Sequence, residues 1–310
     1  MTYKNRAESR NDAVHSQAAS LSGKQGYRAV PFTVNRQMVA ASASVGREQN
    51  NIHTITEVDI SEPRRLIREH AQRTGERLSL TAYITACLAQ TVAEYPKLNS
   101  FRKGKKLVIL DDITISVLVE REINGEIVPE NLGIRAAQTK TPWQIHEEIR
   151  AAQAHGDDAL GGLSGITWLR FIPAFLFRTF IRIASGNIQM MKRYGAIGVT
   201  AVGMFGPKNQ ALWAIPLVGG ATVGVAVGGI VERPSVNNGQ IETREHLCLT
   251  ISFNHDIVDG APAARFVKRF SELLMSGELL ANETDIALRD TESQTQGADQ
   301  IYTKVQGSRK

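Results

Sequence analysis

One histidine stands where a side chain can do acid–base chemistry. His255 directly follows the apolar, β-branched run 248–253 and precedes Asp259 and Gly260, where a helical pattern opens. A strand-to-helix junction holds a side chain firmly and leaves it exposed. A neutral imidazole has a pKa of about 6.5, so near neutral pH it can take a proton from a thiol or a hydroxyl. A lone histidine after a strand is more often a surface residue, so spacing alone does not establish this role.

No other cluster of residues predicts a reactive site. Four further histidines lack metal-ligand spacing with Cys87 or Cys248, so we expect no zinc site from His53, His70, His146 and His246. The glycine pairs 219–220 and 228–229 lack the Lys-Ser/Thr of a phosphate loop and the helix of a dinucleotide fingerprint. We interpret them as bends in buried strands.

The hydrophobic pattern predicts the elements that must position His255. Short β-branched runs predict strands at 52–60, 107–110, 113–119, 126–128, 197–203, 222–232 and 246–253. Apolar residues at helical spacing predict helices after Ser61, before Pro96, at 142–152 and at 262–275. Asn124–Gly125 is a strong hairpin signal. The pattern indicates an α+β domain with a mixed sheet.

The composition is typical of one folded domain with polar ends. The 310 residues divide into a predicted disordered arm at 1–26, a domain at 27–277 and a predicted disordered tail at 278–310. The net charge of +5 arises from short basic clusters without interleaved aromatic residues, so nucleic acid is not an expected partner. Cys87 and Cys248 lie in separate apolar segments, which predicts reduced, buried thiols and a cytoplasmic location.

Three segments resemble one enzyme family and occur in that family's order. They are His255-x-x-x-Asp259-Gly260 with the residues up to Phe266, the glycine-rich stretch from Gly195 to Gly206, and the strand from Val225 to Pro234. These segments resemble the catalytic domain of the dihydrolipoamide acyltransferases of 2-oxo acid dehydrogenase complexes. Chloramphenicol acetyltransferase is similar around the histidine and shares that fold. The resemblance covers about residues 32–274, except for the middle of the chain.

The resemblance implies a fold, an assembly and a reaction. The fold would be a two-layer arrangement of a mixed sheet and helices, as in chloramphenicol acetyltransferase, assembled as a homotrimer or a larger particle. Acyl-coenzyme A would be the substrate, and no metal would be required. His255 would be the general base, and the acceptor would be a thiol such as dihydrolipoamide.

The resemblance also assigns roles to further residues. Thr200 stands where the family has a serine that stabilises the oxyanion, and it would act from a neighbouring subunit. Asp259 would pair with an arginine near the N-terminus, for which Arg36 is the candidate. Asn254 and Gly260 would support the histidine loop. No residues are assigned to binding coenzyme A.

The sequence departs from the family pattern in three ways. About thirty polar residues precede the domain, too few for a lipoyl domain, so we expect a lipoyl carrier to act in trans. Asn254-His255-Asp256 stands where the family has Asp-His-Arg, which replaces a cation beside the histidine with an anion and leaves a raised histidine pKa or a different acceptor as alternatives. Residues 155–194 form an insertion that contains an apolar and basic stretch at 166–183.

The insertion has two interpretations. Arg170, Arg178 and Arg182 share one side of a helix, as in helices at membrane surfaces, while these arginines and Pro173 disfavour a membrane span. A lid or an oligomer contact is the favoured interpretation, and contact with a membrane surface is the alternative.

Two alternatives to acyl transfer onto a thiol remain open. The first is the same coenzyme A-dependent chemistry with a hydroxyl or an amine of a small molecule as acceptor. The second is a non-catalytic trimeric scaffold, against which the retention of His255, Asp259 and a hydroxyl at Thr200 argues.

Overall fold

The computed structural model describes residues 27, 29–30, 32–123, 126–154, 174–216, 220–237 and 239–281. The predicted arm at 1–26, the first part of the insertion at 155–173 and most of the predicted tail lie outside the described residues.

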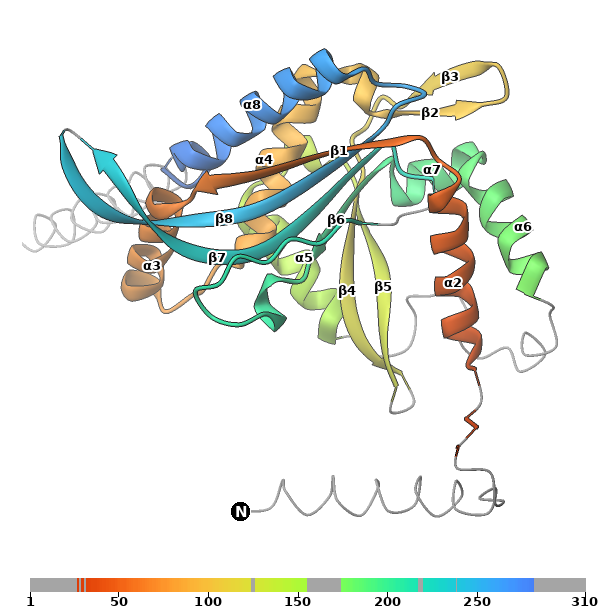
Figure 1. Ribbon diagram of the computed structural model, residues 1–310, viewed down its shortest axis with the longest axis horizontal. Coiled ribbons are helices and arrows are strands. Elements are labelled where there is room, and N and C mark those ends of the chain that lie inside the picture. The colour runs from red at the N-terminus through yellow and green to blue at the C-terminus, as the bar shows by residue number, and fades with distance from the viewer. Residues whose placement is uncertain are drawn as a thin grey trace, which may run out of the picture.

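A six-stranded mixed sheet forms the centre of the molecule, in the order β1-β8-β7-β6-β4-β5 (Figure 1). Its strands are β1 (Asn51–Asp59), β4 (Ile115–Ile123), β5 (Glu126–Ile134), β6 (Ile197–Ala201), β7 (Val223–Asn237) and β8 (Gln240–Asn254). The pairs β4–β6 and β6–β7 are parallel, and the other neighbours are antiparallel. The expected α+β class with a mixed sheet is confirmed, and Ile123 pairs with Glu126 as the hairpin signal predicted.

Helices cover one face of this sheet and bury its apolar side chains. They are α3 (Ser61–Thr74), α4 (Leu80–Glu94), α5 (Pro142–Ala154) and α8 (Gly260–Ser276). Along β8, alternate residues such as Leu249, Ile251 and Phe253 enter the core, where Phe266 of α8 meets Phe253 edge to face. This main core ties β8 and α8 together, so the short connection between them, which carries His255, has fixed ends.

The opposite, outer face of the sheet carries small and polar side chains such as Ala226, Thr250 and Ser252, together with exposed apolar ones such as Ile55. A register shift between Val227 and Ile230 lies at Gly228–Gly229, which confirms the predicted bend. A Cβ atom at Gly228 would collide with the carbonyl oxygen of Leu212, so glycine lets the loop after β6 pack directly on the strand. This loop begins with the 3₁₀ turn η5 (Gly203–Phe205).

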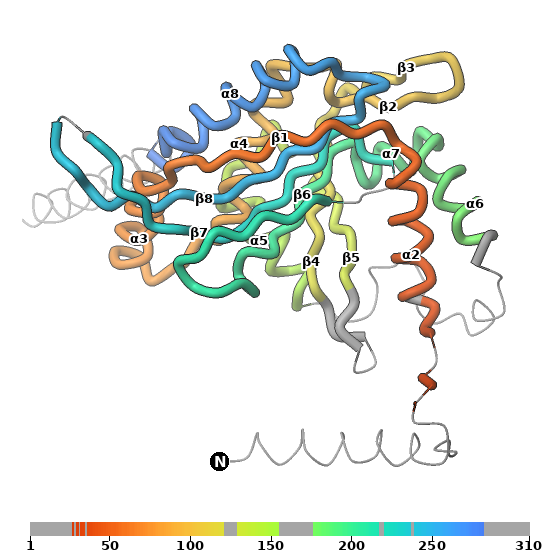
Figure 2. The backbone as a smooth tube through the Cα atoms, in the orientation of Figure 1, coloured from red at the N-terminus to blue at the C-terminus, as the bar shows by residue number. Residues whose placement is uncertain are grey.

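Two smaller units lie outside the sheet and its helical layer. The first unit is the hairpin of β2 (Ser100–Lys103) and β3 (Lys106–Ile109), which follows the 3₁₀ turn η2 (Pro96–Leu98). A further 3₁₀ turn, η3 (Ala137–Thr139), precedes α5. The helices α2 (Val34–Arg47), α6 (Ala174–Ser185) and α7 (Ile188–Tyr194) lie beyond the start of β1. Figure 2 shows α2 and α6 side by side, and they share an apolar cluster of their own.

Both cysteines, Cys87 and Cys248, are buried free thiols, as expected from their apolar surroundings in the sequence. Burial raises the pKa of each thiol, because the thiolate would lose its hydration. Among the described residues, no helix combines the length and the apolar character that crossing a membrane requires.

Candidate active site

His255 lies on the turn that joins β8 to α8, at the junction predicted from the sequence. Its side chain is 44% exposed, and its Nδ1 atom lies 3.8 Å from Oδ1 of Asp259. That distance is too long for a hydrogen bond but allows attraction once the imidazole is protonated. The backbone N–H of His255 donates to the carbonyl oxygen of Asn50 over 2.6 Å. The imidazole is therefore accessible while its backbone is anchored.

The turn is organised by Asn254 and anchored by two buried aliphatic residues. The side-chain oxygen of Asn254 accepts a hydrogen bond from the backbone N–H of Asp256 at 3.0 Å. The backbone carbonyl oxygen of Asn254 accepts from the N–H groups of Ile257 and Val258. Asparagine favours such local bonds, which close a turn. Ile257 and Val258 are buried in the main core, whereas Gly260 faces open space. Asn254 thus closes the turn with its hydrogen bonds, and the open space around Gly260 would accommodate a side chain at that position.

Asp256 is the carboxylate that ties the turn to other elements. Its Oδ2 atom lies 3.0 Å from NH1 of Arg102 in β2, and its Oδ1 atom accepts from Nδ2 of Asn50 at 2.9 Å. The anion that replaces the family's arginine is thereby compensated by a guanidinium from the hairpin. Sequence reasoning missed Asn50 entirely and interpreted Arg102 only as part of a short basic cluster.

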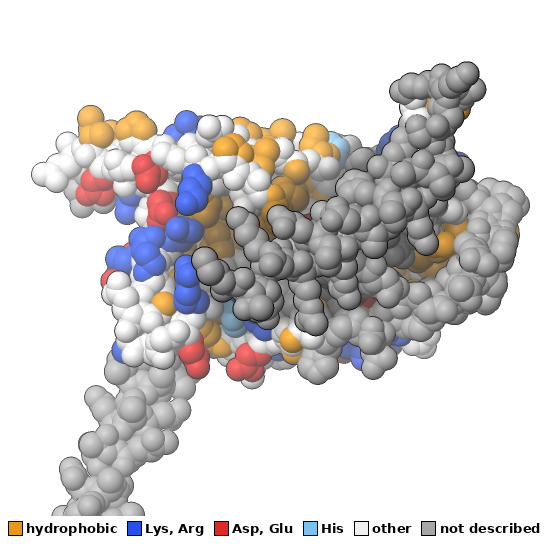
Figure 3. Space-filling view, turned by 90° about the horizontal axis from the view of Figure 1, so that it is seen from below, with side chains coloured by type: hydrophobic (Ala, Val, Ile, Leu, Met, Phe, Trp, Pro, Cys, Tyr) orange, Lys and Arg blue, Asp and Glu red, His pale blue; other side chains and the backbone are white. Residues whose placement is uncertain are grey.

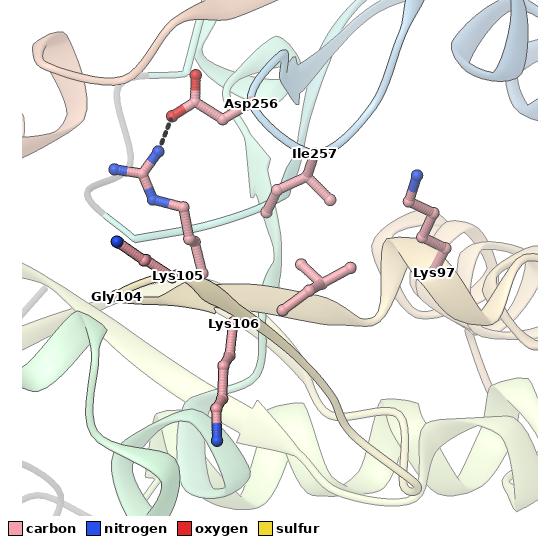
Figure 4. Close-up of a pocket in the computed structure, with 8 residues that line it drawn as sticks. Lys97, Gly104, Lys105, Lys106, Asp256 and Ile257 are labelled. Carbon is pink, nitrogen blue, oxygen red and sulfur yellow. Dashed lines mark hydrogen bonds and ion pairs between the residues drawn. The ribbon is translucent and has the colours of Figure 1, made fainter.

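A pocket of about 410 Å³ opens beside this turn (Figure 4). It is lined by Lys97, Arg102, Gly104, Lys105, Lys106, Leu107, Asp256 and Ile257. Lys97 and Lys105 lie on opposite sides of Ile257, and Lys106 points away from Asp256 (Figure 4). No ion pair joins these three lysines to another described residue. The pocket therefore combines uncompensated positive charge with an aliphatic floor.

The charges elsewhere differ from those of this pocket. Figure 3 shows basic side chains next to acidic ones on the face seen from below. Outside the pocket, several arginines are paired with carboxylates, as Arg233 is with Glu57, and Arg64 and Arg68 are with Glu245. A second pocket of about 140 Å³ lies on the other side of the turn, between η2 and residues 257–259.

Thr200 lies on the outer face of the sheet and not beside His255. It pairs with Ala226 of β7, which in turn pairs with Thr250 of β8. Five residues of extended chain, about 16 Å, separate Thr250 from His255, and Thr200 lies two strands further across. One chain therefore does not bring these two residues together.

The expected pair between Arg36 and Asp259 stays a prediction, and the two residues lie on different elements of the chain. Arg36 lies in the first turn of α2, and the helix separates it from Asn50 by roughly 20 Å. No ion pair joins the two residues within this chain, and the partner found for Asp259 among the described residues is His255. The helix formed by residues 34–47, which the sequence analysis did not predict, carries Arg36 away from the histidine turn.

The insertion is partly described. Arg178 and Arg182 of α6 both pair with Glu48 at the end of α2, so these two arginines are engaged within the protein, while Arg170 lies outside the described residues. Leu176, Phe180 and Ile183 are exposed on α6. Their exposure agrees with the favoured interpretation of a lid or an oligomer contact, which stays a prediction.

Comparison with known proteins gives one family. The sequence profile described as "2-oxoacid dehydrogenases acyltransferase (catalytic domain)" matches residues 24–160 and 186–281. It passes over residues 161–185, which include all of α6.

Curated relatives and solved structures agree with this match. The chain is 26% identical over 264 residues to the lipoamide acyltransferase component of the branched-chain alpha-keto acid dehydrogenase complex of Bacillus subtilis, covering 81% of this chain and 53% of the relative. It is 23% identical over 249 residues to the mitochondrial dihydrolipoyllysine-residue succinyltransferase component of the 2-oxoglutarate dehydrogenase complex of Saccharomyces cerevisiae. This match covers 78% of this chain and 46% of the relative. The chain thus spans about half the length of these relatives.

Solved structures show the same fold. A probable dihydrolipoamide acetyltransferase from Listeria monocytogenes superposes with a TM-score of 0.60 at 22% identity, covering 80% of this chain and 94% of that one. The dihydrolipoamide acetyltransferase of Azotobacter vinelandii superposes with a TM-score of 0.61 at 19% identity, covering 82% of this chain and 94% of that one. Its structure was solved to investigate the roles of a serine, a histidine and an asparagine in its catalytic mechanism.

Proposed function

Because this chain belongs to the family of 2-oxoacid dehydrogenases acyltransferase catalytic domains, we propose that it moves an acyl group between coenzyme A and a thiol, such as dihydrolipoamide on a carrier protein in trans. The observation that carries the proposal is an exposed imidazole on an anchored turn between β8 and α8, within the segment that resembles the family's active-site signature. The names of the curated relatives, which are lipoamide and dihydrolipoyllysine-residue acyltransferases, support the same reaction.

His255 acts as the general base in this proposal. It accepts the proton of the attacking thiol, and the resulting thiolate attacks the thioester carbonyl. The bond to the departing sulfur then breaks, and that sulfur recovers the proton from His255. The Asp259 carboxylate lies 3.8 Å from Nδ1, on the side of the ring that holds this nitrogen.

Thr200 supplies the hydroxyl that donates to the oxyanion of the tetrahedral intermediate. Since one chain keeps Thr200 and His255 apart, the proposed site joins His255 of one subunit to Thr200 of the next subunit in a homotrimer. Exposed apolar side chains on and after the strands of the outer face, such as Ile55, Met204 and Phe205, support a covered interface on that side.

The cation-lined pocket fits the charged part of coenzyme A. Clustered lysine and arginine side chains bind phosphate groups well. Leu107 and Ile257 form an aliphatic floor on which the flat ring of the nucleotide base of coenzyme A can pack. We assign Lys97 and Lys105 to the phosphates, because they flank Ile257 without ion-pair partners among the described residues.

Release of free coenzyme A thiol, measured with several acyl groups and with thiol, hydroxyl and amine acceptors, tests the reaction and identifies the acceptor class. His255→Ala should lower the rate by roughly a hundredfold to ten-thousandfold. His53→Ala is the matched control, because His53 is another exposed histidine and it bonds to Ser252 on the outer face. Equal rates for the wild type and His255→Ala would rule out the proposed mechanism.

Mixed subunits test the shared site. Thr200→Ala alone should lower the rate by roughly a hundredfold to a thousandfold. When Thr200→Ala and His255→Ala chains are refolded together, about a quarter of the sites should combine an intact histidine with an intact threonine from the neighbouring chain. Activity far above that of either variant would follow, whereas a site within one chain would show no recovery.

A further inference from the structure

The inserted helix α6 packs on α2 rather than on the main core. Phe177 of α6 and Ala41 of α2 are buried against each other, with Met38 and Ile181 beside them. The family profile passes over the whole of α6, so its matched positions do not account for this contact. The two helices form a unit at the end of the sheet where β1 begins (Figure 1).

Charge fixes the register of this helix pair. Arg178 and Arg182 are four residues apart on one side of α6, and both bind the carboxylate of Glu48, one arginine to each oxygen. Glu48 is the C-cap of α2. Two guanidinium groups on one carboxylate leave it little freedom to rotate, so the end of α2 is held where α6 places it.

A tight turn connects Glu48 to the proposed active site. The backbone N–H of Glu48 donates to the carbonyl oxygen of Val45, and that of Gln49 donates to the carbonyl oxygen of Gly46. The N–H of Asn51 donates to the carbonyl oxygen of Gln49. Asn50 lies inside this turn. Its carbonyl oxygen accepts from the N–H of His255 at 2.6 Å, and its side-chain amide donates to Asp256 at 2.9 Å.

We propose that Asn50 is a positioning residue for His255, and that the inserted helix α6 sets the place of Asn50 by holding Glu48 with two arginines. The inference rests on the proposed role of His255 as the base. It gives the insertion a task in the reaction, because movement of α6 shifts the backbone to which the histidine turn is bonded. A displacement of about 1 Å at a reacting group can cost up to a hundredfold in rate.

Four variants of the chain test this link. Glu48→Gln keeps the shape of the side chain and removes its charge, and Arg178→Gln with Arg182→Gln removes both partners. Each should lower kcat roughly tenfold while KM for coenzyme A changes less than about twofold. Combining all three substitutions should lower kcat no further, because each set breaks the same link. Arg178→Lys with Arg182→Lys keeps the charges and should retain most of the rate.

Glu94→Gln is the matched control. Glu94 binds Arg269 through both oxygens and is about as exposed as Glu48, but this pair joins α4 to α8 and has no connection to Asn50. It should leave kcat unchanged. Equal kcat values for Glu48→Gln and Glu94→Gln would overturn the inference.

Hydrogen exchange at the backbone N–H of His255 reads the link directly and does not depend on activity. This N–H should exchange roughly tenfold faster in Glu48→Gln and in the double arginine variant than in the wild type, at an unchanged melting temperature. Unchanged exchange in both variants would overturn the inference. If the wild type had no transferase activity, the proposed function would fail, and the exchange rates would still decide whether α6 positions the turn.

Discussion

The main core and the α2–α6 pair are held by different forces. In the main core, aromatic side chains such as Phe253, Phe266 and Phe270 are fully buried between the sheet and α8. The α2–α6 pair buries few side chains, and the ion pairs at Glu48 set its register. The histidine turn lies between the two regions. We therefore expect the main core to supply most of the stability, whereas the α2–α6 pair can adjust the histidine turn without unfolding the domain.

Removing one aromatic ring from each region gives the largest expected contrast. Phe266→Ala should lower the free energy of unfolding by about 3–5 kcal/mol, because the ring is 0% exposed and packs among other rings. Phe177→Ala should cost less than about 2 kcal/mol, because α6 can collapse onto α2. Urea unfolding followed by circular dichroism measures both. Equal losses would mean that α2 and α6 belong to the cooperative core.

The contrast also explains what the sequence could predict. Periodic apolar patterns and continuous apolar runs predicted β1, α4, α5, β7, β8 and α8, because these elements supply most of the buried side chains of the main core. The same approach missed α2, whose apolar side chains mostly meet one other helix, and β2, a four-residue strand of a separate hairpin. Elements that bury few apolar side chains show only a weak hydrophobic pattern in the sequence.

The candidate site was predictable to a similar extent. The position of His255 follows from a strand that ends and a helix that begins, both readable in the sequence. The partners that hold the turn, Asn50 and Arg102, come from residues more than a hundred and fifty positions away, so no local spacing points to them. The place of Arg36 could not be predicted, because the helix at residues 34–47, which the sequence pattern did not indicate, leads away from the histidine turn.

Reversing the charges at the hairpin should have a smaller effect than the core substitution. Asp256→Arg restores the family's residue but places it against Arg102, so we expect a loss of about 1 kcal/mol in the free energy of unfolding and a lower kcat. Adding Arg102→Asp should restore most of the lost stability, because the pair re-forms with its charges exchanged. The value of kcat should recover less, because arginine has no atom that can accept the hydrogen bond from Asn50. Urea unfolding and steady-state kinetics measure the two variants. No recovery in the double variant would show that the ion pair does not hold the turn.

The smallest expected effect is the response of the α2–α6 pair to acid. Hydrogen bonds from Arg182 and then Arg178 lower the pKa of Glu48 from its ordinary value of 4.5. The folded carboxylate therefore binds a proton less readily than the unfolded one, so this contribution to stability is complete above 4.5 and is lost as the pH falls through the lowered pKa. Hydrogen exchange of the α6 amides, compared between the wild type and Glu48→Gln at the same pH, should differ near neutral pH and converge in stronger acid. A difference that persisted in strong acid would mean that packing, and not the charge of Glu48, holds α6 in place.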